Sequence, residues 1–352
     1  MNIFVSEYLC SGACELSEAE AGLLNEGTAM LEAVLADLLA LPHTQVITGL
    51  QQNLSLKSPE IEEAIRGDRL QVFRAATPEQ ESENFKTACQ MADAVLIIAP
   101  EFDDLLFRRT QLAVDGGATV AGPDLKTLQL TADKWEFYQW MQDCSLPTIP
   151  TCLLSEELSP SAVSVPCLIK HRCGAGGLGL ETFENENCLQ QRWNDLITAE
   201  EQFLLQPFLK GKPLSTVALI RAGQRELFPA GEQQICWEHG FQYQGGIIPA
   251  DLESSVLTAI DDLVNHVCDL LPGLAGYVGF DILLPDNAPN EPVLVEINPR
   301  LTTSYTGYRR LTQDNLAARI IDFQTTFPRI QWKQGETVRF QPDGSTSLIT
   351  QL

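Results

Sequence analysis

Oxygen-bearing side chains recur at alternate positions between residues 279 and 298, in a stretch that predicts an antiparallel β-hairpin. Glu296 and Asn298 are two residues apart, so they share one face of a strand. Asp281 lies in the preceding strand, and the turn-rich segment between the two strands allows them to pair. Carboxylate and amide oxygens are hard ligands, of the kind that hold Mg²⁺ against phosphate groups. These three residues are therefore candidate metal ligands.

The register of this hairpin decides whether the three side chains meet. Pairing of Leu284 with Val293 places Asp281 opposite Glu296. The large apolar neighbours would then face a core; they are Phe280, Ile282, Val295 and Ile297. The alternative is a solvated surface hairpin, which such a regular placement of polar residues between large apolar ones disfavours. Arg300 follows two residues after the strand and adds a cation that can hold phosphate through two N–H groups.

A second candidate site is a glycine cluster that directly follows a short apolar segment. Gly174, Gly176 and Gly179 match GxGxxG literally, but a dinucleotide fingerprint needs a helix to open at the last glycine. Residues 180–183 instead alternate like a strand, and no GK[ST] follows, so a Walker A loop is excluded as well. A hairpin loop that lays backbone N–H groups over phosphates remains, with Lys170 placed to reach them. The alternative, a tight hairpin beside a solvated lysine, stays open at this stage.

The elements that must position these residues fall into two parts. The first third alternates strands and helices, which predicts a doubly wound α/β domain ending near residue 122. Its expected strands are 3–5, 46–48, 94–99 and 118–121, with a helix whose apolar face is Leu31, Val34, Leu35 and Leu38. The remainder predicts helices over 124–143 and 256–270, a loop over 155–166, and strands at 167–170, 180–183, 203–206, 216–221, 279–284 and 293–298. The last 25 or so residues predict short strands or an ordered tail.

Composition limits the partners. The formal net charge is −24, whereas nucleic acids and anionic membranes attract basic faces, so we expect neither as a partner. No segment approaches the ~20 apolar residues of a membrane span, and the first ten residues lack the basic region of a signal peptide. The ten cysteines form no CxxC pair, which is typical of reduced core thiols and indicates a cytoplasmic protein.

Taken in order along the chain, the motifs resemble the ATP-grasp superfamily of carboxylate–amine ligases. The resemblance covers roughly residues 1–325, and its motifs are Asp133-Lys134, Lys170 before the glycine loop, Gln206-Pro207-Phe208-Leu209, Asp281, and Glu296-x-Asn298-x-Arg300. More narrowly, the chain resembles the tyramine–glutamate ligase branch, which acts in methanofuran biosynthesis. The segments that carry this narrower likeness are 6–8, 25–27, 99–101 and 298–305.

The resemblance implies an α/β and α+β fold in three parts. A Rossmann-like pre-ATP-grasp domain would span 1–122, a central ATP-grasp subdomain with the glycine-rich lid 123–205, and a C-terminal subdomain with the metal hairpin and tail 206–352. It also implies roles for single residues. Lys134 and Lys170 would hold the ATP phosphates, and Asp281, Glu296 and Asn298 would bind Mg²⁺, with two ions expected and Mn²⁺ as a substitute. The lid would be Gly174, Gly176, Gly177 and Gly179, the adenine segment Gln206 to Leu209, and the residues at the reacting phosphate Arg300, Lys170 and Lys134.

The implied reaction joins a carboxylate to an amine through an acyl phosphate, with an amino acid such as glutamate and a tyramine- or tyrosine-like amine as substrates. We expect the amine to be held by Glu7 at the end of the first strand and the amino acid by Thr302, Thr303, Ser304 and Tyr305. An exposed loop position for Glu7 is the alternative. For the whole protein, the alternatives are a different acid and amine pair, or a nucleotide-binding regulator without catalysis. A homodimer is left open.

Overall fold

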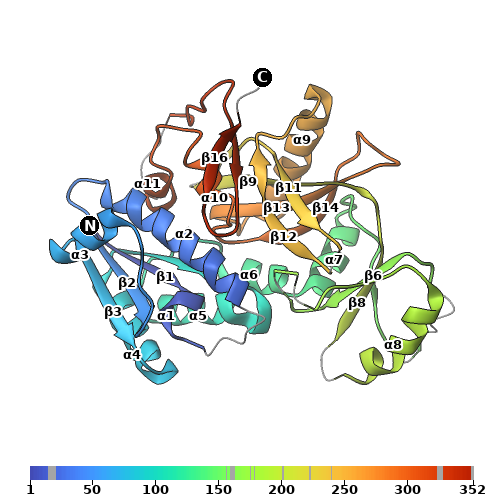
Figure 1. The fold of residues 1–352 in the computed structure, drawn as a ribbon, viewed down its shortest axis with the longest axis horizontal. Helices are drawn as coiled ribbons and strands as arrows, with labels where there is room; N and C mark the ends of the chain where they lie inside the picture. The colour runs from blue at the N-terminus through green and yellow to red at the C-terminus, as the bar shows by residue number, and fades with distance from the viewer. Residues whose placement is uncertain are drawn as a thin grey trace.

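The computed structural model describes the chain except for residues 15–20, 156, 159–162, 175, 178, 200–201, 222, 239, 323–327 and 350–352. The predicted loop at 155–166 and the predicted tail therefore lie partly outside the described residues. Three sheets organise the fold (Figure 1). Among the described residues, no helix combines the length and apolar character that crossing a bilayer requires.

The first sheet is parallel, with strand order β3-β2-β1-β4. Its strands are β1 (Asn2–Glu7), β2 (Gln45–Gln51), β3 (Leu70–Ala75) and β4 (Ala94–Ile98), and its helices are α1 (Tyr8–Ser11), α2 (Ala21–Leu39), α3 (Pro59–Arg66), α4 (Pro78–Met91) and α5 (Leu105–Asp115). Every residue of β4 is buried, as its continuous apolar run predicts for a strand covered on both faces. The strand expected at 118–121 was wrong: this segment makes only an isolated bridge from Val120 to Val95.

The helix expected over 124–143 is two helices, α6 (Leu125–Ala132) and α7 (Lys134–Asp143). Asp133 separates them because its backbone is extended and its carboxylate accepts from the N–H groups of Trp135 and Glu136. An aspartate that caps a helix in this way satisfies donors that the first turn leaves free. The break fixes Lys134 as the first residue of α7.

The second sheet is small and antiparallel, in the order β5-β8-β6-β7. It comprises β5 (Cys152–Leu153), β6 (Cys167–His171), β7 (Glu181–Phe183) and β8 (Phe203–Pro207), and α8 (Glu186–Thr198) packs on it through Leu189, Trp193 and Leu196. In Figure 1 this unit projects to one side of the molecule. The predicted boundary at residue 205 falls inside β8, and the three-domain division remains a prediction.

The third sheet has eight strands, in the order β14-β13-β9-β11-β12-β15-β16, with β10 beside β9. The strands are β9 (Gly211–Arg221), β10 (Gln224–Leu227), β11 (Gly231–Cys236), β12 (Gln242–Ile248), β13 (Gly276–Pro285), β14 (Val293–Asn298), β15 (Thr337–Phe340) and β16 (Thr346–Ile349). Helix α9 (Ser254–Leu270) buries the apolar face expected from its spacing, and α10 (Tyr305–Tyr308) and α11 (Leu316–Ile321) follow β14.

One apolar core joins the first and third sheets. It contains Val5 and Leu31 from the N-terminal unit together with Tyr277, Tyr305 and Phe340 from the C-terminal one. Helix α2 lies between the two sheets, beside α10 and α11 (Figure 1). This packing brings the carboxyl end of β1 and the first turns of α2 close to the segment that follows β14.

Candidate active site

The hairpin β13–β14 brings the expected metal ligands together. Asp281 pairs with Glu296 and Gly279 with Asn298, and the amide of Asn298 donates to Asp281 Oδ2 at 2.9 Å. Gln233 on β11 donates to the other oxygen, Oδ1, at 2.8 Å. The carboxylate of Asp281 is thus oriented by two neutral amides.

The register differs from the expected one by a bulge. Leu283, not Leu284, pairs with Val293, and the register shifts between Asp281 and Ile282. Val295 is the extra residue, and it lines the adjoining cavity. Leu294 is fully buried in the core. The expectation that Val295 faces the core was therefore wrong, because a bulge interrupts the alternation on which it rested.

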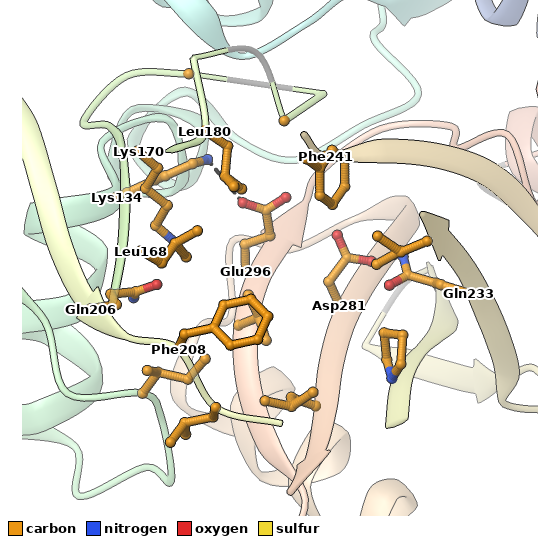
Figure 2. A pocket seen from close by; sticks show the side chains of 18 of the residues that line it. Lys134, Leu168, Lys170, Leu180, Gln206, Phe208, Gln233, Phe241, Asp281 and Glu296 are labelled. Carbon is orange, nitrogen blue, oxygen red and sulfur yellow. Dashed lines mark hydrogen bonds and ion pairs between the residues drawn. The ribbon is translucent and has the colours of Figure 1, made fainter. Parts of the chain in front are cut away.

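Two lysines, Lys134 and Lys170, lie near these carboxylates. Lys134 Nζ lies 2.9 Å from Glu296 Oε2. A dashed line marks this ion pair in Figure 2. Burial by itself raises the pKa of Glu296, but the charges of Lys134 and Lys170 outweigh it and lower that pKa. Burial and then the charge of Glu296 raise the pKa of Asp281. Burial, reinforced by the charge of Lys134, lowers the pKa of Lys170 to about 8. Lys134 and Lys170 thus lie beside the carboxylates of Asp281 and Glu296.

A cavity of about 210 Å³ extends from these charges between the small and the large sheet. Its far part is apolar and includes Ile149, Leu168, Phe208, Leu283 and Val295. All four residues of the expected adenine segment line it, from Gln206 to Leu209. The side-chain nitrogen of Gln206 donates to Thr151 at 2.7 Å, whereas its Oε1 is buried and has no partner among the described residues. A buried acceptor without a donor is costly, so this oxygen points to a missing hydrogen-bond donor.

The glycine cluster forms the hairpin loop between β6 and β7, and no helix opens after it. Gly176, Gly177 and Gly179 have positive φ values, which favour glycine. A Cβ on Gly177 would lie 2.1 Å from Phe241, so this loop packs directly on the ring. Gly174, Gly176 and Gly177 line the cavity; Gly179 does not appear in its described lining. These three glycines therefore line the same cavity as Lys134 and Lys170.

A second cavity, of about 140 Å³, adjoins the first. The two share Asp281 and Glu296 as a common wall, together with Gln233, Phe241 and Tyr243. Thr302, Thr303 and Ser304 line the second cavity, and their contact with a substrate remains a prediction. Tyr305 does not: it is fully buried, and its hydroxyl donates to Asp37. Because Tyr305 starts α10, its ring turns into the core instead.

Arg300 also lines the second cavity and forms an ion pair with Glu101. The guanidinium donates from Nε and Nη2 to the two carboxylate oxygens, at 2.9 and 3.0 Å. Burial alone would lower the pKa of Arg300, but the charge and hydrogen bonds of Glu101 raise it above its usual value. Arg300 is therefore a fixed cation with a dedicated counter-ion from the N-terminal unit.

Glu7 ends β1, as expected, and its side chain is buried. It is 2% exposed, so it is not an exposed loop residue, and its carboxylate accepts from the N–H of Cys10 at 2.7 Å as the cap of α1. Burial raises its pKa to about 7. Glu7 is absent from the described lining of both cavities. Its contact with an amine substrate remains a prediction.

Several site residues were not assigned a role from the sequence. Gln233, Phe241 and Tyr243 lie on or beside β11 and β12, which were not expected as strands. Glu26 and Glu101 belong to segments that carried the family likeness, which was the one available signal for them. Their partners are hundreds of residues away along the chain.

Comparison with known proteins agrees with this geometry. Residues 131–304 match the ATP-grasp domain and residues 54–127 match the pre ATP-grasp 3 domain. A tyramine–L-glutamate ligase from Methanocaldococcus fervens is 26% identical over 230 residues, which is 65% of this chain and 65% of that protein.

Two solved structures share the fold. An ATP-grasp superfamily protein from Archaeoglobus fulgidus aligns with a TM-score of 0.69 at 20% identity, covering 96% of this chain and 92% of that one. The N5-carboxyaminoimidazole synthetase from Staphylococcus aureus complexed with ADP aligns with a TM-score of 0.69 at 15% identity, covering 96% and 81%. The chain thus consists of a pre-ATP-grasp domain followed by an ATP-grasp domain and belongs to the ATP-grasp superfamily.

Proposed function

We propose that the protein is an ATP-dependent ligase that forms an amide from a carboxylate and an amine, with release of ADP and phosphate. The observation that carries this proposal is the pair of adjoining cavities with a common wall of Asp281 and Glu296. One cavity is a largely apolar slot that ends in two lysines; the other is polar and contains Arg300. A nucleotide in the first would direct its terminal phosphate toward a substrate in the second.

The first cavity fits ATP. The orphaned Oε1 of Gln206 can accept from the exocyclic amino group of adenine. Pro207 has no N–H, and the N–H of Phe208 already donates to the carbonyl oxygen of Pro166. The N–H of Leu209 is therefore the one that we expect to donate to the base. Lys134 and Lys170 would bind the phosphates, and the loop from Gly174 to Gly179 would close over them.

The metal ligands fit Mg²⁺ as part of a shared site. Among the described residues, no three His, Cys, Asp or Glu side chains gather as a complete metal site. Asp281, Glu296 and Asn298 offer two carboxylates and an amide, which suits a cation that takes its remaining ligands from phosphate oxygens and water. Mg²⁺ would neutralise charge on the phosphates there.

In the proposed reaction, a carboxylate oxygen of one substrate attacks the γ-phosphorus of ATP, and ADP leaves. The amine nitrogen then attacks the acyl carbon, the C–O bond breaks, phosphate leaves, and the nitrogen loses a proton. Arg300 and the lysines hold the transferring group by charge and geometry, which is most of what phosphoryl transfer requires. The glycine loop excludes water, which would otherwise hydrolyse the acyl phosphate.

The substrates to test first follow from the archaeal relative, whose name specifies tyramine and L-glutamate. A tyrosine-like amine is the next choice, and the product would then be a precursor of a methanofuran-type cofactor. The ten cysteines form no disulfide, which suits a reduced, ATP-containing compartment such as the cytoplasm.

The test is a screen of ADP and phosphate release with MgATP. L-Glutamate is paired with tyramine, tyrosine and a panel of other amines, and the amide product is identified by mass spectrometry. Release that needs both an acid and an amine, with an amide formed in equal amount, is the expected result. ATP binding without turnover for every pair would instead favour a nucleotide-binding regulator.

A further inference from the structure

Among the described residues that line the second cavity, the carboxylate of Glu26 differs from the other charged groups in its partners. Arg300 is matched by Glu101, Glu296 by Lys134, and Asp281 by two amides. Glu26, which enters from helix α2, accepts only a neutral hydroxyl: Thr303 Oγ1 donates to Oε2 at 2.8 Å. No lysine or arginine in the described part of the chain lies within ion-pair distance of it. Glu26 therefore has no ion-pair partner of its own among the described residues, although the charge of Arg300, which is paired with Glu101, also acts on it.

Its position is built by the packing of α2 on the N-terminal sheet. Gly27 is buried next to Glu7, and a Cβ there would lie 2.6 Å from that carboxylate. The glycine allows the helix to approach this closely, which places Glu26 in the lining of the second cavity beside Thr303. Glu7 thus supports the helix that carries Glu26.

The surroundings of Glu26 disfavour a lone negative charge. Burial is the main cause that raises its pKa. A ligand cation would offset this desolvation, because an ion pair favours the charged carboxylate. Thr302 and Ser304, whose hydroxyls lie 2.8 Å apart, add acceptors without adding charge. An ammonium group has three N–H donors, so it can use a carboxylate and two hydroxyls together.

We propose that Glu26 receives a primary ammonium group of a substrate in the second cavity. The proposal deepens the ligase function and rests on it for the identity of the substrate. The ammonium has two sources: the α-ammonium of the amino acid whose carboxylate is activated, or the protonated form of the acceptor amine. Both present the same chemistry to Glu26, and the experiment separates them.

The experiment measures binding by calorimetry in the presence of Mg²⁺ and a non-hydrolysable ATP analogue. The probes are two matched pairs that differ by an amino group: L-glutamate with glutarate, and tyramine with 4-ethylphenol. In the native protein, at least one amine-bearing probe should bind about 10- to 100-fold more tightly than its partner. The pair that shows this preference identifies the source of the ammonium.

Glu26→Gln should abolish the preference while the affinity for the ATP analogue stays within about twofold. Thr303→Val should weaken the preference by a smaller factor, because it removes the hydrogen bond that orients the carboxylate. Glu63→Gln, the same substitution at an exposed position of α3, is the matched control and should preserve it. The proposal is overturned if the Glu26→Gln variant keeps the preference for the amine-bearing probe. It is also overturned if the native protein shows no such preference in either pair. Failure of the ligase function is a separate result: Glu26-dependent binding without ADP release.

Discussion

Replacement of Glu101 by Gln tests whether the N-terminal unit sets the position of Arg300, the cation that we propose to hold the reacting phosphate. Glu101 makes two hydrogen bonds to Arg300, and the two side chains are 7% and 15% exposed. Removing one partner of a buried ion pair lowers protein stability by about 3–5 kcal/mol. Gln keeps one acceptor oxygen, so we expect about 2 kcal/mol of lost transition-state stabilisation, which is about a 30-fold fall in kcat.

The assay is steady-state ADP release at saturating substrates, with KM for ATP measured separately. Glu101 is absent from the described lining of the cavity proposed for ATP, so that KM should change by less than about threefold. Asp103→Asn removes a charge from an exposed neighbour and should leave both constants unchanged. Arg300→Lys keeps the charge but cannot form both bonds, and it should lose kcat to a similar degree. If both Glu101→Gln and Arg300→Lys kept wild-type kcat while folded, the argument for a positioned Arg300 would be refuted.

Three further predictions follow from the site and its supports. Glu296→Gln should abolish ATP turnover without unfolding the protein, because the loss of a Mg²⁺ ligand leaves the phosphate charge uncompensated. ADP release at the wild-type rate, with an unchanged Mg²⁺ requirement, would contradict the ligand assignment. Gly177→Ala should raise KM for ATP by about tenfold or more, because a left-handed alanine costs about 1–2 kcal/mol and its Cβ meets Phe241, and Phe241→Ala in the same chain should recover part of the loss. Glu7→Gln should change the pH dependence of stability: a folded pKa of about 7, raised from 4.5, gives stability that is complete below pH 4.5 and is lost as pH rises through 7. In denaturant unfolding of the full chain, the free energy of unfolding of the Gln variant should therefore rise by about 2.5 kcal/mol relative to wild type between pH 5 and pH 8. A difference that stays constant over this range would refute the buried-acid argument.

Local patterns in the sequence determined much of the fold and part of the site. Alternation over residues 279–298 predicted that Asp281 lies opposite Glu296, and the structure pairs them. The strand after the glycine cluster indicated a hairpin loop rather than a helix N-terminus, which the structure also contains. These inferences succeeded because period, turn residues and strand spacing are properties of neighbouring residues.

The same local arguments failed where a single residue changes the pattern. The bulge beside Asp281 moved Val295 to the cavity, and Asp133 divided one apolar helical period into two helices. Tyr305 entered the core because α10 packs against α2, a contact that the hydroxyl-rich sequence around it does not disclose. In each case hydrogen bonding or packing outweighed the local pattern.

Only the tertiary structure decided which partners the site charges take. Arg300 meets Glu101 across 199 residues, and Thr303 meets Glu26 across 277. No spacing rule connects such residues, because their contact depends on how α2 and the parallel sheet dock on the large sheet. The sequence alone thus determined which chemical groups are available and which local elements carry them. Docking of the two sheets decided which charge is neutralised within the protein and which is left for a ligand.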